Sequence, residues 1–204
     1  WDKYQKTLNN EVNFSGIGLH SGAKVDVTLV PANSNSGIVF KRTDLEKDNE
    51  IVANFKNVSS AKLCTKIENN HGVSVSTIEH LLAAFYVCGI DNIIVNLNGP
   101  EVPIMDGSAK EFVNIINDVG LKTLEGKRKF VRVKKSVELK KEDGRSISVK
   151  PSNQTFDVIF TLNYKKNPLI KKQTNKINFA QKNLKEIVDA RTFCLYEDIE
   201  MIKS

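Results

Sequence analysis

The order in which apolar patterns follow one another constrains the fold most, because a strand pattern gives way to a helical pattern twice along the chain. In the first strand pattern, Val25, Val27 and Leu29 alternate with polar residues, whereas in the helical patterns apolar residues recur every three or four positions. Two successive units of this kind predict an α+β protein with a duplicated, sandwich-like plan. The strand patterns fall at residues 25–40, 93–97 and 131–162, and the helical patterns at 76–87, 108–120 and from 178 onward.

A charged stretch over residues 125–129 separates the two units and predicts a linker. We therefore expect a first domain over residues 1–126 and a second over residues 127–204. Within the second, Asp143-Gly144 predicts a hairpin turn, and Leu195–Ile202 a last helical segment. The chain then stops without a closing strand, so the second domain is expected to be incomplete. Because position 1 is not Met, the chain is also expected to begin after a native start.

Both helices of the first unit begin with a capping-box pattern, in which a Ser and a Glu three residues later satisfy backbone N–H groups at the helix start. Ser76 and Glu79 form the first pair, and Ser108 and Glu111 form the second. The pattern predicts that Ser76 is the N-cap of its helix and that Gly89 ends that helix. It also gives Glu79 a purely structural explanation.

The net charge of +6 suits an anionic partner, either a nucleic acid or a phosphorylated small molecule. The basic residues are spread widely, however, and the lysines over residues 165–172 lack the interleaved aromatic residues that stack on bases. An ordinary solvated surface therefore explains the charge more simply than nucleic-acid binding. No apolar run approaches the roughly 18 residues that a membrane helix needs.

Three cysteines, Cys64, Cys88 and Cys194, lie far apart and form no CxxC pair. Their odd number argues against a disulfide framework, and their spacing argues against a cysteine-rich zinc site. A reducing, cytoplasmic setting fits this pattern best.

Glu79 and His80 stand side by side at the start of the first predicted helix. A carboxylate that can deprotonate water and an imidazole that can hold a metal are the minimum set for metal-assisted hydrolysis. One histidine cannot hold a catalytic zinc ion, which usually takes three protein ligands. The alternatives are a capping Glu79 and a His80 that simply lies on the helix surface.

Other candidates have equally simple explanations. His20 lies in the glycine-rich turn Gly16–Gly22, which lacks the spacing of a phosphate-binding P-loop, and His71 lies in a polar loop. Spacing leaves open a zinc site made of His20, His71 and His80, since ligands can converge in the fold. Asp106 is either a catalytic acid or a residue that caps the following helix.

Taken together, several short motifs resemble the UDP-3-O-acyl-N-acetylglucosamine deacetylase family, zinc amidases of lipid A biosynthesis in Gram-negative bacteria. They occur in the family's order and cover essentially the whole chain, which makes the set far more specific than any single motif. The matching segments are 16–22, 41–45, 63–65, 76–81, 89–92, 103–108 and 190–193.

The resemblance implies a fold of two β-α-α-β sandwich domains with their helices packed face to face. It implies that His80 is a ligand of a Zn2+ cofactor, that Glu79 is the general base, and that the hydroxyl of Thr192 stabilises the oxyanion. The implied reaction is hydrolysis of the 2-acetamido group of a UDP-3-O-acyl-N-acetylglucosamine, which releases acetate early in lipopolysaccharide synthesis. A cytoplasmic monomer is expected, with this substrate as its partner, without nucleic acid and without stable insertion in a membrane.

In the family, a His and an Asp one helical turn apart complete the zinc site beyond the position of Ser204, and a further His acts as the general acid. These residues are absent from the 204 residues of the chain, which is therefore expected to be truncated and, alone, inactive. The alternative is a stand-alone protein that binds a nucleotide or nucleic acid through its positive charge, without catalysis.

Overall fold

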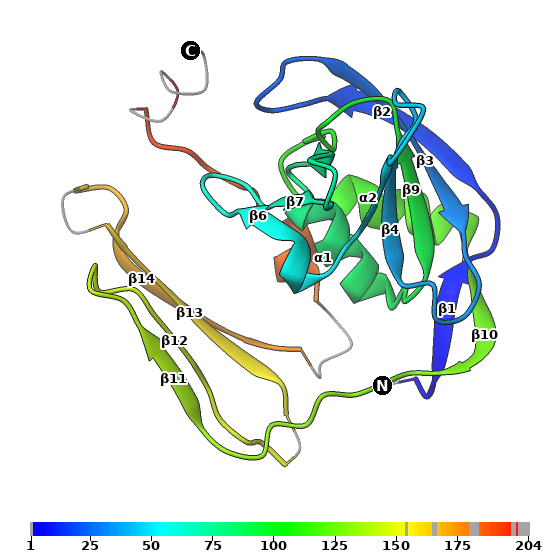
Figure 1. Ribbon diagram of the computed structural model, residues 1–204. Helices are drawn as coiled ribbons and strands as arrows, with labels where there is room; N and C mark the ends of the chain where they lie inside the picture. The colour runs from blue at the N-terminus through cyan, green and yellow to red at the C-terminus, as the bar shows by residue number, and fades with distance from the viewer. Residues whose placement is uncertain (1, 154, 165–166, 180–183, 197–198, 200–204) are drawn as a thin grey trace. The chain divides into compact units, whose positions relative to one another are not determined.

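The computed structural model describes most of the chain and divides it into two compact units (Figure 1). One unit comprises residues 129–184, and the other comprises residues 2–128 together with the described residues from 185 onward. The described residues are 2–153, 155–164, 167–179, 184–196 and 199.

The larger unit is built around a five-stranded sheet with the strand order β2-β3-β9-β4-β5. Neighbouring strands are antiparallel except β4 and β9, which are parallel. The alternation predicted along β3 is confirmed, since Val25, Val27 and Leu29 are all buried. The strands are β2 (Val12–Ile17), β3 (Lys24–Pro31), β4 (Ile38–Arg42), β5 (Glu50–Val52) and β9 (Ile93–Leu97).

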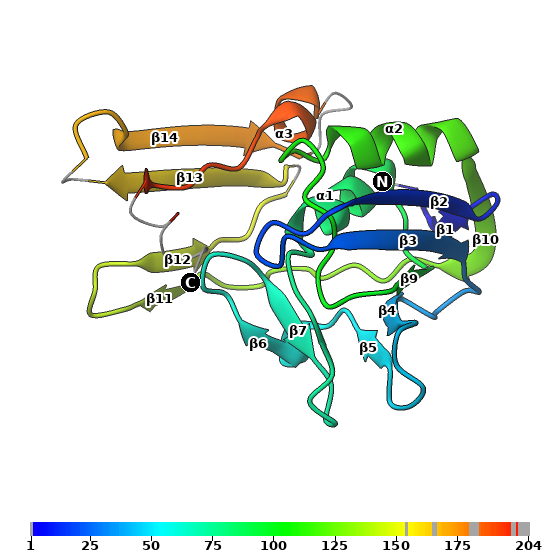
Figure 2. The same cartoon turned by 90° about the horizontal axis from the view of Figure 1, so that it is seen from above.

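Among its described residues, this unit has the helices α1 (Glu79–Cys88), α2 (Lys110–Val119) and the short α3 (Lys185–Asp189). Figure 1 shows α1 and α2 on one side of the five-stranded sheet, and α3 contacts both of them, as Figure 2 shows for α2. The core lies between helices and sheet and contains Phe40, Phe85 and Phe112, each fully buried. None of the described helices is long and apolar enough to cross a membrane.

Two smaller sheets complete the larger unit. In the first, β1 (Tyr4–Leu8) pairs antiparallel with β10 (Leu121–Lys127). The predicted linker over residues 125–129 is therefore wrong for residues 125–127, because pairing with a strand more than a hundred residues away outweighs the local excess of charge. The second small sheet contains β6 (Val58–Ser60), β7 (Lys66–Glu68) and β8 (Ser74–Val75), and the 3-10 turn η1 (Phe55–Asn57) precedes it.

The capping box predicted for α1 is wrong, and the one predicted for α2 is confirmed only in that the Ser108 hydroxyl accepts a hydrogen bond of 3.1 Å from the backbone N–H of Lys110. The residue that precedes α1 is Ile78, and the residue that precedes α2 is Ala109, and neither side chain can accept a hydrogen bond. Ser76 lies outside α1 because its backbone forms a β-bridge with Glu101. The predicted end of α1 is confirmed, since Gly89 follows the helix with a left-handed φ of 78°.

The smaller unit, residues 129–184, consists of two antiparallel hairpins. The turn predicted at Asp143-Gly144 is confirmed, and Gly144 has the positive φ of 86° that such turns favour in glycine. The hairpins pair β11 (Val137–Lys140) with β12 (Ser146–Val149) and β13 (Asp157–Tyr164) with β14 (Lys171–Asn178).

The described part of the chain is thus a mixed α/β structure with several sheets and three helices, which confirms the fold class in its coarse form. The third helix was predicted to open at Asn178, but that residue ends β14, and α3 begins at Lys185. Residues 180–183 and most of the predicted segment Leu195–Ile202 lie outside the described residues. The division into domains 1–126 and 127–204 stays a prediction.

Candidate active site around Glu79

Glu79 is the first residue of α1 and is half-buried. Because Ser76 is engaged in a β-bridge rather than in a cap, the structural explanation for Glu79 as part of a capping box does not hold. Its carboxylate instead accepts a hydrogen bond of 3.1 Å from the backbone N–H of Thr65, which lies between β6 and β7. The side chain is therefore held by a loop that lies outside its own helix.

Thr77, two residues before Glu79, has an unusual backbone. Its φ is 57°, in the left-handed region that a β-branched residue rarely adopts, and its side chain is buried. Such residues persist only where the surrounding structure holds them, and they are concentrated at functional sites. The Thr77 hydroxyl donates a hydrogen bond of 2.9 Å to the carboxylate of Glu101.

Glu101 is a buried carboxylate that joins separate parts of the chain, with 2% of its surface exposed. Besides the Thr77 hydroxyl, it accepts the backbone N–H groups of His20, at 3.0 Å, and Ser21, at 2.9 Å. A Cβ atom on Gly18 would lie 2.5 Å from Glu101 Oε2, so the glycine-rich turn can approach the carboxylate only because Gly18 has no side chain.

The hydrogen bonds to Glu101 outweigh its burial. Burial by itself raises the pKa of this carboxyl, but the N–H groups of His20 and Ser21 and the hydroxyls of Ser21 and Thr77 together bring the pKa below the usual 4.5. Glu101 is therefore ionised near neutral pH. Sequence analysis missed this residue, although an isolated charge in the apolar segment Gly99–Ile104 is a usable signal for a buried carboxylate.

The segment that follows Glu101 holds Thr192. The backbone N–H of Thr192 donates to the carbonyl oxygen of Gly107 at 2.8 Å, and Arg191 Nε donates to the carbonyl oxygen of Asp106 at 2.8 Å. Thr192 is thus anchored through its backbone. Residues 101–108 contact both Thr77, two residues before Glu79, and Thr192, and so connect the two predicted catalytic segments.

Asp106 is bound to the turn that precedes α2. Its carboxylate accepts hydrogen bonds from the Ser108 backbone N–H at 3.0 Å and from the Ser108 hydroxyl at 2.7 Å. These bonds, the hydroxyl first, hold the pKa of Asp106 below its usual value. Asp106 therefore shapes the turn before α2 and does not cap the helix, because its partner Ser108 precedes Lys110, the first helical residue.

The three histidines do not converge. Among the residues that the structure describes, no group of three or more His, Cys, Asp or Glu side chains could hold a metal ion, so the zinc site of His20, His71 and His80 that spacing left open is not formed there. His71 is exposed in a turn near Asp48, and His20 is tied by its backbone to Glu101. His80 is half-buried beside Glu79 on α1. Its imidazole is a suitable zinc donor.

Comparison with known proteins identifies the family of the chain. The family model described as LpxC, UDP-3-O-acyl N-acetylglycosamine deacetylase, matches residues 5–204. A UDP-3-O-acyl-N-acetylglucosamine deacetylase of Wigglesworthia glossinidia brevipalpis is 42% identical over 204 residues, which cover 98% of this chain and 67% of the relative. The deacetylase of Geotalea uraniireducens is 45% identical over 200 residues, covering 98% and 64%, and that of Aliivibrio fischeri is 41% identical over 204 residues, covering 98% and 66%.

The chain thus spans about two thirds of the length of these relatives. A family match over nearly the whole chain confirms the resemblance found in the short motifs. The chain belongs to the UDP-3-O-acyl N-acetylglycosamine deacetylase family, a family of zinc amidohydrolases that acts in lipid A biosynthesis.

Proposed function

We propose that this chain carries the general base, one zinc ligand and the oxyanion-stabilising hydroxyl of a UDP-3-O-acyl-N-acetylglucosamine deacetylase. The reaction is hydrolysis of the 2-acetamido group, which yields acetate and a free amine. The observation that carries the proposal is the position of Glu79, whose carboxylate is held by Thr65 across a loop instead of capping α1. A carboxylate held in this way beside a metal-binding imidazole is suited to act on a water molecule.

Each residue has a distinct task in this reaction. Glu79 takes the proton of the attacking water, and its hydrogen bond from Thr65 keeps one carboxylate oxygen fixed. The Thr192 hydroxyl donates to the oxygen of the acetamide as negative charge develops there, while its backbone stays anchored on Gly107. His80 would hold zinc, which supplies a Lewis acid and a water of pKa about 7.

The remaining parts of the site come from outside these residues in this proposal. A His and an Asp beyond Ser204 complete the three protein ligands that catalytic zinc requires, and a later His protonates the leaving amine. The two-domain sandwich with facing helices, the monomeric state and the cytoplasmic location belong to the same proposal. The family match, together with relatives that are longer than this chain, supports it.

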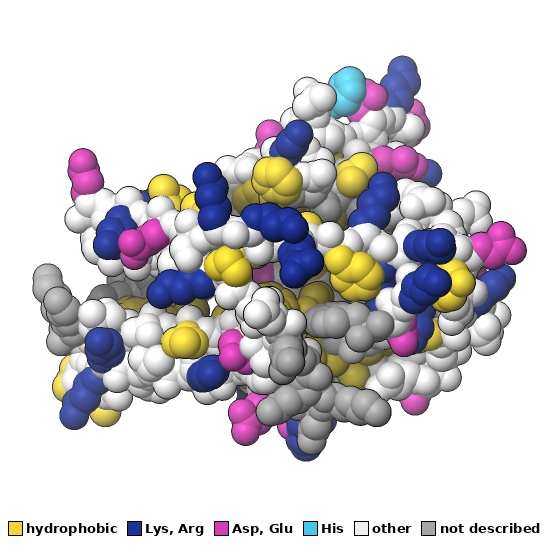
Figure 3. Space-filling model, turned by 90° about the horizontal axis from the view of Figure 1, so that it is seen from below, with side chains coloured by type: hydrophobic (Ala, Val, Ile, Leu, Met, Phe, Trp, Pro, Cys, Tyr) yellow, Lys and Arg dark blue, Asp and Glu magenta, His cyan; other side chains and the backbone are white. Residues whose placement is uncertain are grey.

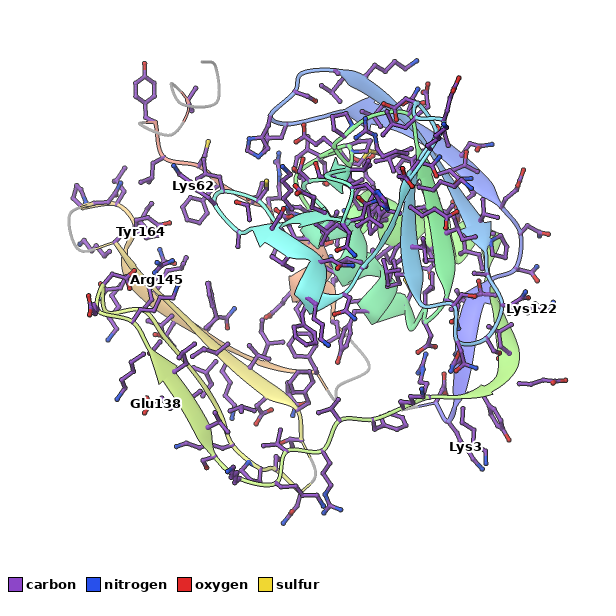
Figure 4. The ribbon with its side chains drawn as sticks, in the orientation of Figure 1. Lys3, Lys62, Lys122, Glu138, Arg145 and Tyr164 are labelled. Carbon is purple, nitrogen blue, oxygen red and sulfur yellow. The ribbon has the colours of Figure 1, made fainter. Side chains whose placement is uncertain are left out.

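The positions of the Lys and Arg side chains do not support the alternative function, which is binding of a nucleic acid or nucleotide without catalysis. On the face shown in Figure 3, Lys and Arg side chains are interspersed with acidic, apolar and neutral ones. In the larger unit, Lys62 lies on the loop between β6 and β7, whereas Lys3 precedes β1 and Lys122 lies on β10 (Figure 4).

The test compares two histidines in the complete protein that the gene encodes. His80→Ala is expected to lose bound zinc and acetate release, whereas the matched control His71→Ala, in an exposed turn, retains both. Bound zinc is measured by atomic emission after dialysis. Deacetylation is followed with an amine-reactive probe that labels the free amine of the product. Retention of zinc and activity by His80→Ala would overturn the assignment.

A further inference from the structure

A buried carboxylate, Glu101, supports the segment that leads into α1. Glu101 accepts hydrogen bonds from Thr77, which precedes the Glu79-His80 pair, and from the N–H groups of His20 and Ser21 in the glycine-rich turn. The backbone of the two segments is also joined, because Ser76 N–H donates to Pro100 at 2.9 Å and Val102 N–H donates to Ser76 at 3.0 Å. Glu101 therefore lies where three segments of the larger unit meet.

The conformation of Thr77 needs such a partner. A β-branched residue with a φ of 57° is strained, and a chain that relaxed this strain would rotate the following residues relative to the body of the unit. The residues that follow are Ile78, which is buried, and then Glu79 and His80. A change in the backbone at Thr77 is thus transmitted directly to the proposed base and metal ligand.

We propose that Glu101 is the positioning residue of the active site, holding Thr77 in its left-handed conformation and thereby setting the direction in which Glu79 and His80 project. This inference rests on the proposed function, since it assigns a support to that base and that ligand. Glu101 lies behind the reacting groups and acts through Thr77. Its second task is to hold the His20 turn against the same point of the fold.

A simple contribution to stability is the competing explanation, and the kinetic constants separate the two. Displacement of a catalytic group by about 1 Å can cost about 100-fold in rate, so Glu101→Gln is expected to lower kcat by about this factor while KM stays within about threefold. Zinc affinity should also fall, because the backbone change at Thr77 would shift the direction in which His80 projects. A purely structural role would lower the melting temperature and leave kcat unchanged at temperatures well below melting.

The same prediction can be tested at the other end of the hydrogen bond. Thr77→Val keeps the shape of the side chain and removes the hydroxyl, so kcat should fall by about 10-fold or more, whereas Thr77→Ser keeps the donor and should stay within about threefold of the wild type. This pair keeps the proposal testable if Glu101→Gln does not fold. Glu111→Gln, on α2, is the control for loss of a carboxylate.

The outcomes separate this inference from the proposed function. Normal kcat in both Glu101→Gln and Thr77→Val, with loss of activity in His80→Ala, would overturn the positioning role alone. Loss of kcat in Glu101→Gln with normal kcat in Thr77→Val would overturn the route through Thr77. Zinc and activity retained by His80→Ala would overturn the proposed function itself.

Discussion

Phe112 provides a quantitative test of how α2 packs in the larger unit, because this side chain joins α2 to the five-stranded sheet. The side chain is fully buried and meets Phe14 of β2 edge to face, with ring centroids 5.5 Å apart. Replacing a buried Phe by Ala typically costs about 3–5 kcal/mol in the free energy of unfolding, through lost transfer energy and the cavity left behind. An edge-to-face pair contributes about 0.5–1.5 kcal/mol of such a loss.

Urea denaturation followed by circular dichroism measures this difference. With a urea m-value of about 1–3 kcal/mol/M, Phe112→Ala should lower the midpoint by about 1 M or more. The matched control is Phe55→Ala in η1, where the side chain is 81% exposed and the expected change is within about 0.5 kcal/mol. Equal midpoint shifts for the two variants would refute the packing of α2 against the sheet.

Two further predictions concern titration. Because the pKa of Glu101 is lowered in the folded protein, its contribution to stability is present above the usual value of 4.5 and is lost as pH falls through the lowered pKa. The gap in unfolding free energy between wild type and Glu101→Gln should therefore shrink on acidification, and a constant gap between pH 7 and pH 3 would contradict this. Burial raises the pKa of the Cys88 thiol to about 11, so at pH 8 iodoacetamide should modify exposed Cys194 well before Cys88, as peptide mass mapping can show.

The sequence predicted the parts of the fold that depend on neighbouring residues. Alternation identified the buried face of β3, and Gly89 identified the end of α1. The start of α1 was wrong because Ser76 pairs with Glu101, a partner 25 residues away that local pattern does not reveal. The linker over residues 125–127 was wrong for the same reason, since its partner β1 lies at the other end of the unit.

In the candidate site too, features that depend on neighbouring residues could be predicted, and features that depend on distant residues could not. Glu79 and His80 could be identified as neighbours with suitable chemistry, yet the capping alternative for Glu79 was removed only by the structure. Thr192 has no local pattern that indicates a role, and its anchor on Gly107 is a long-range contact. Glu101 was not predicted as a site residue because its hydrogen-bond partners come from two segments that are distant in the sequence.

The most direct test of the account is the rate of acetate release by the complete, zinc-loaded enzyme carrying Glu79→Gln. This change keeps the size of the side chain and its place at the start of α1 but removes the base, so kcat should fall by about 100- to 10,000-fold. Glu111→Gln, in the first turn of α2, is the matched control and should retain the wild-type rate. A Glu79→Gln enzyme that releases acetate as fast as this control would contradict the central claim that Glu79 is the catalytic base.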